Sequence, residues 1–247
     1  MNRMIHESGH LDGIPMVDWA LDQFGVNIEV KGKELIPTNG KFIFPANHPI
    51  GGLDGLAIIS VVAKIRQPVK FVVNDLLKVI KGFEPVALYI ARFGRINRQN
   101  AILMNKTLSS DAQLLVQPAG AVSKRNPVKI SDLPWNKFFI RKAIQYKRDV
   151  IPVHVQARNS RLFYNIASFR KIFRIKSNLE MFLLPREMFN KSGKTITITV
   201  GKPIAYKTFD ESRTHLEWAQ KVREYVYLLG SKNFSSARTI PFFSDIL

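Results

Sequence analysis

Hydrophobic and polar residues alternate along this chain with two different periods. Short apolar runs, for example at residues 42–44 and 112–116, have the length and composition of buried strands. Between them lie longer stretches in which apolar residues recur every three or four positions, as on one face of a helix. Because strands that alternate with helices are typical of βαβ units, we expect an α/β fold with a mainly parallel sheet flanked by helices.

The same periods predict the individual elements. Strands are expected at residues 26–30, 42–44, 69–73, 112–116, 149–155, 180–184 and 194–200. Helices are expected at residues 14–24, 55–65, 76–80, 100–108, 135–146 and 209–229. Asp210 is the expected capping acid of the last helix. We therefore predict one main domain at 36–230, with a small helical piece at 1–35 and an irregular tail at 231–247.

One stretch combines an apolar stripe with an unusual charge pattern. Residues 158–176 contain six cations and no acid. Leu162, Ile166, Phe169 and Phe173 fall at helical spacing within it. Such a stripe packs against a core by default, but its cationic flanks favour an amphipathic helix that lies in a membrane interface.

Composition narrows the function classes. The chain has 247 residues, no cysteine, and a formal net charge of +18. Disulfides, thiolate zinc sites and cysteine nucleophiles are therefore excluded, and the histidines show no metal-ligand spacing. A surface with this charge attracts acidic partners: nucleic acid, anionic lipid headgroups or an acidic carrier protein. No apolar run reaches the roughly 18 residues of a membrane span, and residues 1–13 lack the apolar core of a signal peptide. We expect a cytoplasmic protein, soluble or lying on a membrane.

A turn between a predicted strand and a predicted helix carries one histidine and one carboxylate. His48 and Asp54 are six positions apart, with Gly51 and Gly52 between them. An imidazole is the natural general base near neutral pH, and a carboxylate on its far nitrogen fixes its tautomer. The turn contains no serine or cysteine, so the nucleophile is expected to come from a substrate. In the structural alternative, Asp54 caps the helix and His48 bonds to backbone.

Four sequence blocks resemble the glycerophosphate acyltransferase superfamily, which includes the lysophosphatidate acyltransferases. They are the His48–Asp54 turn with Asn47, the basic loop at residues 93–98, the small-residue loop at 116–123, and the apolar proline strand at 150–153. The blocks occur in the family's order and cover roughly residues 40–205. The resemblance implies an acyltransferase domain with acyl transfer from a thioester in membrane lipid synthesis.

Two departures from the family pattern bear on the acceptor. Five residues separate His48 from Asp54, whereas the usual signature has four. The longer spacing is similar to that of a bacterial hemolysin-like subgroup with enzymes of amino-acid lipid synthesis. The third block has Ala119, Gly120 and Ala121 where the family usually carries a carboxylate. The acceptor is therefore left open between lysophosphatidate and a lyso amino-acid lipid.

The resemblance also implies roles for the site residues. His48 would take the proton of an acceptor hydroxyl, and Asp54 would orient His48. Substrate contacts are expected from Asn47, Gly51, Gly52, Gly94, Arg95, Arg98, Gly120, Lys124 and Arg125. Backbone amides near Gly51, Gly52 or Gly120 would stabilise the oxyanion. Arg95 and Arg98 would bind the acceptor's phosphate or carboxylate, and Lys124 and Arg125 would assist or bind a phosphopantetheine donor. Asn47 is expected to brace the turn.

The expected partners follow from charge and resemblance together. They are an anionic membrane surface at the cytoplasmic face of the inner membrane, a lysolipid acceptor, and acyl-CoA or acyl carrier protein as donor. No cofactor or metal is expected. The competing hypothesis is a basic nucleic-acid-binding protein without catalytic activity, although the sequence has no recognised nucleic-acid motif and its cations are dispersed. A hydrolase would need a Gly-x-Ser-x-Gly elbow, which the sequence lacks.

Overall fold

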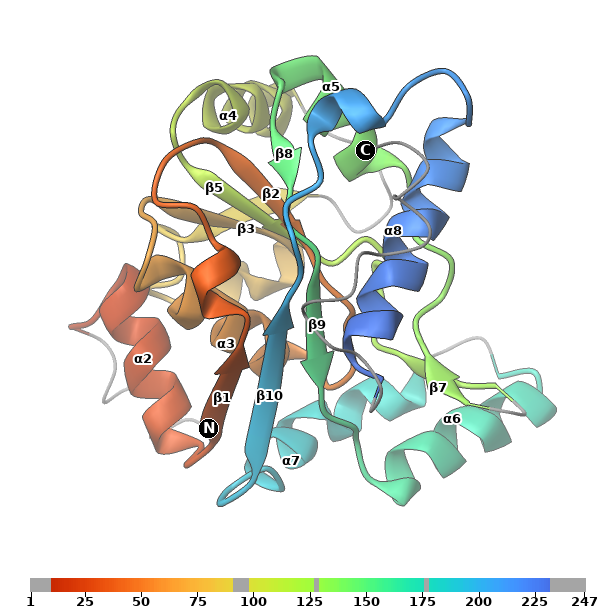
Figure 1. Cartoon of the computed structure of the whole chain (residues 1–247). Helices are drawn as coiled ribbons and strands as arrows, with labels where there is room; N and C mark the ends of the chain where they lie inside the picture. Colours follow the sequence, from red (N-terminus) through yellow and green to blue (C-terminus); the bar gives the residue numbers. More distant parts are fainter. Residues whose placement is uncertain (1–9, 91–97, 127–128, 176–177, 232–247) are drawn as a thin grey trace.

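The computed structural model describes residues 10–90, 98–126, 129–175 and 178–231. Its centre is a five-stranded parallel sheet with the strand order β4-β3-β5-β2-β8 (Figure 1). These strands are β2 (Phe42–Pro45), β3 (Val69–Asn74), β4 (Ala87–Ile90), β5 (Gln113–Val116) and β8 (Asp149–Val150). A three-stranded sheet stands beside it, with β10 (Thr195–Val200) parallel to β1 (Asn27–Lys31) and antiparallel to β9 (Val153–Gln156). The predicted α/β fold with a mainly parallel sheet is confirmed.

Alternating side chains of the central strands fill two separate cores. Phe44 and Leu115 point to one face, against α2 (Gly13–Gln23) and α3 (Gly52–Ala63). Ile43 and Leu114 point to the other face. The helices on that side are α4 (Arg98–Ser109), α5 (Phe138–Tyr146) and α8 (His215–Leu229). The strands read as continuous apolar runs because helices or the second sheet cover both faces.

The remaining described elements are short. They are the 3-10 helices η1 (Lys33–Leu35), η2 (Asp75–Val79), η3 (Leu179–Leu183) and η4 (Tyr206–Thr208), the hairpin of β6 (Lys124–Arg125) and β7 (Ile130–Ser131), and the helices α6 (Arg161–Ile172) and α7 (Leu184–Phe189). In Figure 1, α6 and α7 lie together along the lower edge of the molecule. None of the helices in the described ranges combines the length and apolar character needed to span a membrane.

Several predicted boundaries were wrong. The strand predicted at 149–155 is two strands in different sheets, because Pro152 has no N–H for a ladder and the chain crosses from β2 to β10 there. Residues 180–184, predicted as a strand, belong to η3 and α7, and Pro185 occupies the first turn of α7. The last helix begins at His215, where Thr214 and Glu217 form a capping box, and Asp210 instead caps a turn at Ser212.

Two smaller differences concern helix starts. The helix predicted at 135–146 begins at Phe138, and the one predicted from 76 is the 3-10 helix η2. The N-terminal helix has the predicted buried face, with Val17, Ala20 and Leu21 in the core. Asp18 of this helix accepts a hydrogen bond of 2.6 Å from the Ser60 hydroxyl on α3. This bond ties the N-terminal helix to the helix that follows His48.

Candidate active site

The His48 turn is joined to both sheets. Ala46, next to the end of β2, bridges to Val153, and the Asn47 side chain continues this pairing along β9. Asn47 Nδ2 donates to the Val155 carbonyl at 2.9 Å, and the Val155 N–H donates to Asn47 Oδ1 at 2.7 Å. Asn47 is buried, and its amide is engaged on both sides by the backbone of one residue. This geometry fits the predicted bracing role of Asn47 better than a contact with substrate.

His48 and Asp54 meet directly. The His48 Nδ1 atom lies 3.0 Å from Asp54 Oδ1 and 3.1 Å from Oδ2. Asp54 is fully buried, while 18% of the His48 side chain is exposed. With Nδ1 turned to the carboxylate, Nε2 is the ring nitrogen left for chemistry. The His48 ring therefore contacts the Asp54 carboxylate, as the catalytic hypothesis requires, and Asp54 does not cap the helix as the structural alternative expected. Asp54 Oδ2 also accepts a 2.9 Å bond from the Ile50 N–H in front of the helix.

The extra residue between histidine and aspartate is accommodated at Gly51. Gly51 has a φ of 89°, in the region that favours glycine, and precedes the first residue of α3. A Cβ atom on Gly51 would lie 3.1 Å from Leu184 Cδ2, so α7 closes tightly over this turn. Gly52 faces Met188 on α7 in the same way. These contacts give both glycines a packing role, and a contact of their backbone with substrate remains a prediction.

Gln117 is a member of this site that sequence reasoning missed. Its Nε2 donates a 2.7 Å hydrogen bond to Asp54 Oδ1. Gln117 directly follows β5, the neighbour of β2, so both residues lie at the carboxyl edge of the parallel sheet. Binding sites of parallel sheets lie at the carboxyl ends of their strands, and this rule could have pointed to Gln117, which stands in the third sequence block. Asp54 thus accepts bonds from the Ile50 N–H and the Gln117 amide in addition to its contact with His48.

A second buried carboxylate supports His48 from the other side. Asp132 Oδ1 accepts a 3.2 Å bond from the His48 N–H and a 2.5 Å bond from the Ser123 hydroxyl. Asp132 Oδ2 accepts a 2.9 Å bond from Trp135 Nε1. The Ser123 N–H donates to the His48 carbonyl at 2.7 Å, which closes a ring of bonds around the His48 backbone. Nothing in the sequence spacing pointed to Asp132, which lies 84 positions after His48.

The charges around His48 set its proton affinity. Burial alone would lower the His48 pKa, but the charge and hydrogen bond of Asp54 and the charge of Asp132 outweigh it. The resulting pKa of His48 is raised above its ordinary value of 6.5. An imidazole with a raised pKa is a stronger base, so this site is arranged to take up a proton.

Comparison with known proteins assigns the family. A family model described as "Acyltransferase" matches residues 4–236. The chain belongs to this acyltransferase family. It is an O-acyltransferase, which replaces the alternative of a nucleic-acid-binding protein without catalytic activity.

Two curated relatives and one solved structure are similar to the acyltransferase over most of its length. A lyso-glycine lipid O-acyltransferase of Bacteroides thetaiotaomicron is 40% identical over 93% of this chain and 85% of its own length. A second protein of that name, from Phocaeicola vulgatus, is 37% identical over 93% of this chain and 82% of its own. The crystal structure of PlsC from Thermotoga maritima, a 1-acyl-sn-glycerophosphate acyltransferase, has a TM-score of 0.53 at 16% identity, covering 89% of this chain and 82% of PlsC. The predicted superfamily is confirmed.

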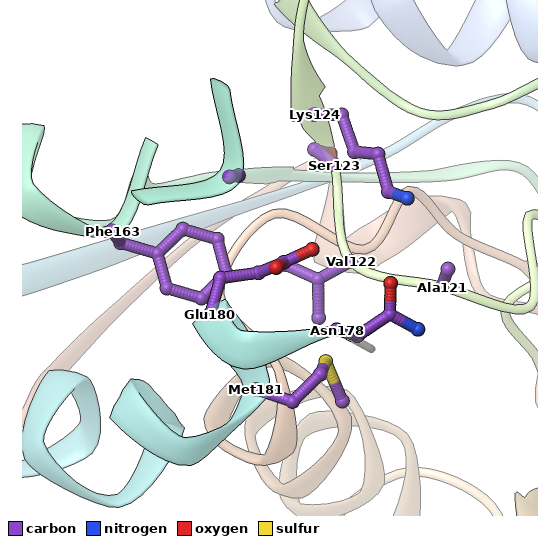
Figure 2. A pocket seen from close by; sticks show the side chains of 9 residues that line it. Ala121, Val122, Ser123, Lys124, Phe163, Asn178, Glu180 and Met181 are labelled. Carbon is purple, nitrogen blue, oxygen red and sulfur yellow. The ribbon is translucent and has the colours of Figure 1, made fainter. Parts of the chain in front are cut away.

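A small pocket of the acyltransferase includes the loop that is bonded to the His48 backbone. Its lining comes from the loop after β5, from α6 and from η3 (Figure 2). Val122, Phe163 and Met181 supply apolar side chains, and Lys124 lies on the opposite side of the view from Met181. The free space inside it is small, about 30 Å³. Ser123 belongs to this lining and also donates its N–H to the His48 carbonyl, so the pocket and the histidine share one loop.

The predicted cations of the acyltransferase have different surroundings. Lys124 lines the pocket, whereas Arg125 donates to Asn165 on α6 at 3.1 Å and lies over the Tyr164 ring. Arg98 is the exposed first residue of α4, which follows the edge strand β4. β3 and β5 separate β4 from the strand that carries His48. Gly94 and Arg95 lie outside the described residues.

Gly120 is placed differently from the expectation. Its N–H donates to the Gln117 carbonyl at 3.0 Å, which closes a turn with a Gly120 φ of 65°. This amide is already engaged and does not face a substrate as an oxyanion donor in this conformation. A Cβ atom on Gly120 would meet no heavy atom within 4 Å, so the positive φ is what favours glycine here.

Proposed function

We propose that this acyltransferase moves a fatty acyl group from an acyl thioester to the hydroxyl of a lysolipid in membrane lipid synthesis. The observation that carries the proposal is the contact of His48 Nδ1 with the buried Asp54 carboxylate at 3.0 Å. The 40% identity to a lyso-glycine lipid O-acyltransferase supports a lyso amino-acid lipid as the acceptor. Lysophosphatidate is the second candidate, and acyl-CoA or acyl carrier protein would deliver the acyl group.

The proposed reaction begins with neutral His48. Its Nδ1–H donates to Asp54, and its Nε2 accepts the proton of the acceptor hydroxyl as the oxygen attacks the thioester carbonyl carbon. The carbon–sulfur bond of the tetrahedral intermediate then breaks, and the imidazolium returns the proton to the leaving thiolate. Asp54 stabilises the imidazolium between these steps. General-base catalysis of this kind contributes about 10²–10⁴-fold.

The oxyanion would be stabilised at the start of α3. The first N–H groups of a helix have no partner within the helix, and the helix dipole makes this end positive. α3 begins at Gly52, four residues after His48. Because the Gly120 amide is engaged with Gln117, the Gly51–Gly52 turn is the better candidate of the two predicted sources.

The anionic groups of the substrates would be bound by cations in and directly after the loops at residues 93–98 and 116–123. Lys124 borders the pocket beside Ser123 and would contact the acceptor headgroup or the donor's phosphopantetheine. Arg95 and Arg98 would bind the acceptor's phosphate or carboxylate, since a guanidinium suits both anions. Arg125 is assigned to holding α6 by its bond to Asn165.

The site of action would be an anionic membrane surface at the cytoplasmic face of the inner membrane. The net charge of +18 supports attraction to such a surface and to an acidic carrier protein. The protein would bind there peripherally.

The acceptor is tested with purified protein and matched lysolipids. A lyso-glycine lipid and a lysophosphatidate with equal acyl chains are each presented with two donors in turn. These are acyl-CoA and acylated acyl carrier protein, both with a labelled acyl group. We expect the glycine lipid to give the higher kcat/KM with at least one donor. A higher value for lysophosphatidate with both donors would reverse the acceptor assignment, and absence of acyl transfer to either lipid would refute the proposal.

A further inference from the structure

The layer formed by α6 and η3 exposes large apolar side chains. Phe182 is 82% exposed, Ile172 75%, Phe173 60% and Phe169 55%. α6 and η3 pack side by side, and the rings of Phe169 and Phe173 are in contact, with centroids 4.2 Å apart. We call this the α6–η3 surface, and it also includes Leu162, Leu179 and Met181. Phenyl rings exposed together in this way mark a surface that contacts an apolar partner.

Exposed arginines flank the α6–η3 surface, while the carboxylates of the same segment are buried. Arg161, Arg174 and Arg186 are exposed. Glu180 and Glu187 are the two carboxylates in the sequence of residues 158–189, and both are buried. Glu180 is paired with Arg170 at 2.9 Å, and Glu187 accepts bonds from Ser160. The acids therefore hold the layer together, while exposed arginines flank its apolar side chains.

Resting on the function proposed above, we propose that the α6–η3 surface docks the enzyme on anionic lipid bilayers. Its phenyl and aliphatic side chains would enter the boundary between headgroups and acyl chains, and its arginines would contact lipid phosphates. A second copy of this chain would bring equal positive charges to the contact and is disfavoured. An acidic carrier protein would satisfy the arginines but would leave the apolar side chains of Ile172 and Phe182 in water.

The position of the surface connects it to the reaction centre. Met181 is 45% exposed on the outside, and it also lines the pocket in Figure 2 together with Phe163 and Ala167 of α6. The opposite lining residue Ser123 is bonded to the His48 backbone. On the inner side, Leu184 packs on Gly51, directly before α3. The α6–η3 surface and the loop that is bonded to the His48 backbone therefore meet at this pocket.

The first experiment compares two sets of variants by co-sedimentation with phosphatidylcholine vesicles, with and without phosphatidylglycerol, at low and near-physiological salt. One variant combines Ile172→Ser with Phe182→Ser. The other combines Arg161→Gln, Arg174→Gln and Arg186→Gln. Arg170 is kept, because it pairs with Glu180 inside the layer. Val79→Ser with Ile102→Ser is the matched apolar control, since these side chains are 78% and 59% exposed on η2 and α4.

We expect the serine variant to bind both vesicle types at least about tenfold more weakly, because two apolar side chains no longer enter the bilayer. The glutamine variant should lose about tenfold or more for anionic vesicles only, and less at higher salt. The control should bind as the wild type does. Equal binding of the serine variant and the wild type would overturn the proposal. So would a wild-type dimer in light scattering that the serine variant converts to monomer.

A second measurement does not depend on lost binding. Because the chain has no cysteine, Phe182→Cys or Val79→Cys creates a single site for an environment-sensitive dye. When anionic vesicles are added, the fluorescence emission of the dye at position 182 should shift to shorter wavelength, and that of the dye at position 79 should not. A shift at neither position, or at 79 only, would overturn the proposed orientation.

Turnover separates this proposal from the proposed function. The serine variant should lose activity on acceptor embedded in vesicles and keep it on a short-chain acceptor in solution. Loss of both activities with an unchanged thermal melt would place these residues in the acyl-transfer site instead and overturn the docking role. A wild type that acylates no lysolipid would refute the proposed function, while the vesicle and dye results would still decide the docking surface.

Discussion

Around His48, carboxylates are buried and hydrogen-bonded, whereas on the α6–η3 surface the phenyl rings of Phe173 and Phe182 are exposed. Asp54 and Asp132 hold the histidine from its ring and from its backbone. On the α6–η3 surface, the acids are turned inward and paired, so that arginines and apolar side chains remain outside. The first region holds one histidine in place by hydrogen bonds, and the second exposes apolar side chains. The two regions meet at the pocket between Ser123 and Met181.

The comparison predicts that replacing His48 abolishes chemistry without affecting membrane contact. His48→Ala should lower kcat by about 10²–10⁴-fold, the contribution of a general base, while vesicle binding stays at the wild-type level. Asp54→Asn should also be severely impaired but should fold better than Asp54→Ala, because the amide can still bond to the helix start. Turnover of a labelled acyl thioester and a thermal melt measure both effects. A His48→Ala variant with more than about a tenth of the wild-type rate would rule out the general-base role.

The Arg170–Glu180 pair tests whether the α6–η3 surface is held as one layer. The side chains are only 14% and 5% exposed, so Arg170→Gln leaves a buried carboxylate without its cation. Such a loss costs up to about 3–5 kcal/mol of unfolding free energy. Urea unfolding should show a clear loss for Arg170→Gln, and adding Glu180→Gln should recover part of it. If the double variant is the less stable of the two, the pair does not act as a unit.

The smallest expected effect concerns Asp132 and the pH profile. The His48 pKa is raised above 6.5 chiefly by Asp54 and further by the charge of Asp132. As the pH falls, kcat/KM should therefore drop with a midpoint above pH 6.5, where His48 becomes protonated. Asp132→Asn should move this midpoint to lower pH and reduce kcat/KM by about tenfold, since a charged hydrogen-bond acceptor is lost. The pH profile distinguishes this from simple misfolding. An unchanged midpoint with reduced kcat/KM would limit Asp132 to holding the loop of Ser123.

The sequence predicted the parallel sheet and the His48–Asp54 turn because both depend on local patterns. Buried strands of a parallel sheet are continuous apolar runs, and the helix after the turn begins within reach of its own acid. The failures were long-range. Residues 180–184 resemble a strand because four apolar side chains follow Glu180, yet they belong to η3 and the start of α7. The single strand expected at 149–155 divides at Pro152, because the backbone before it pairs with β2 and the backbone after it pairs with β10 and with the Asn47 side chain.

By itself, the sequence determined the alternating α/β pattern, the pairing of His48 with Asp54, and the excess of cations. Only the tertiary structure decided which distant residues support the histidine: Gln117, Ser123 and Asp132 reach it from the neighbouring strand end and the loop that follows. It also decided that Glu180 is buried while Phe182 is exposed. The physical reason is that hydrogen bonds and burial at these positions depend on the packing of segments far apart in the chain, whereas periodicity records only neighbours along it.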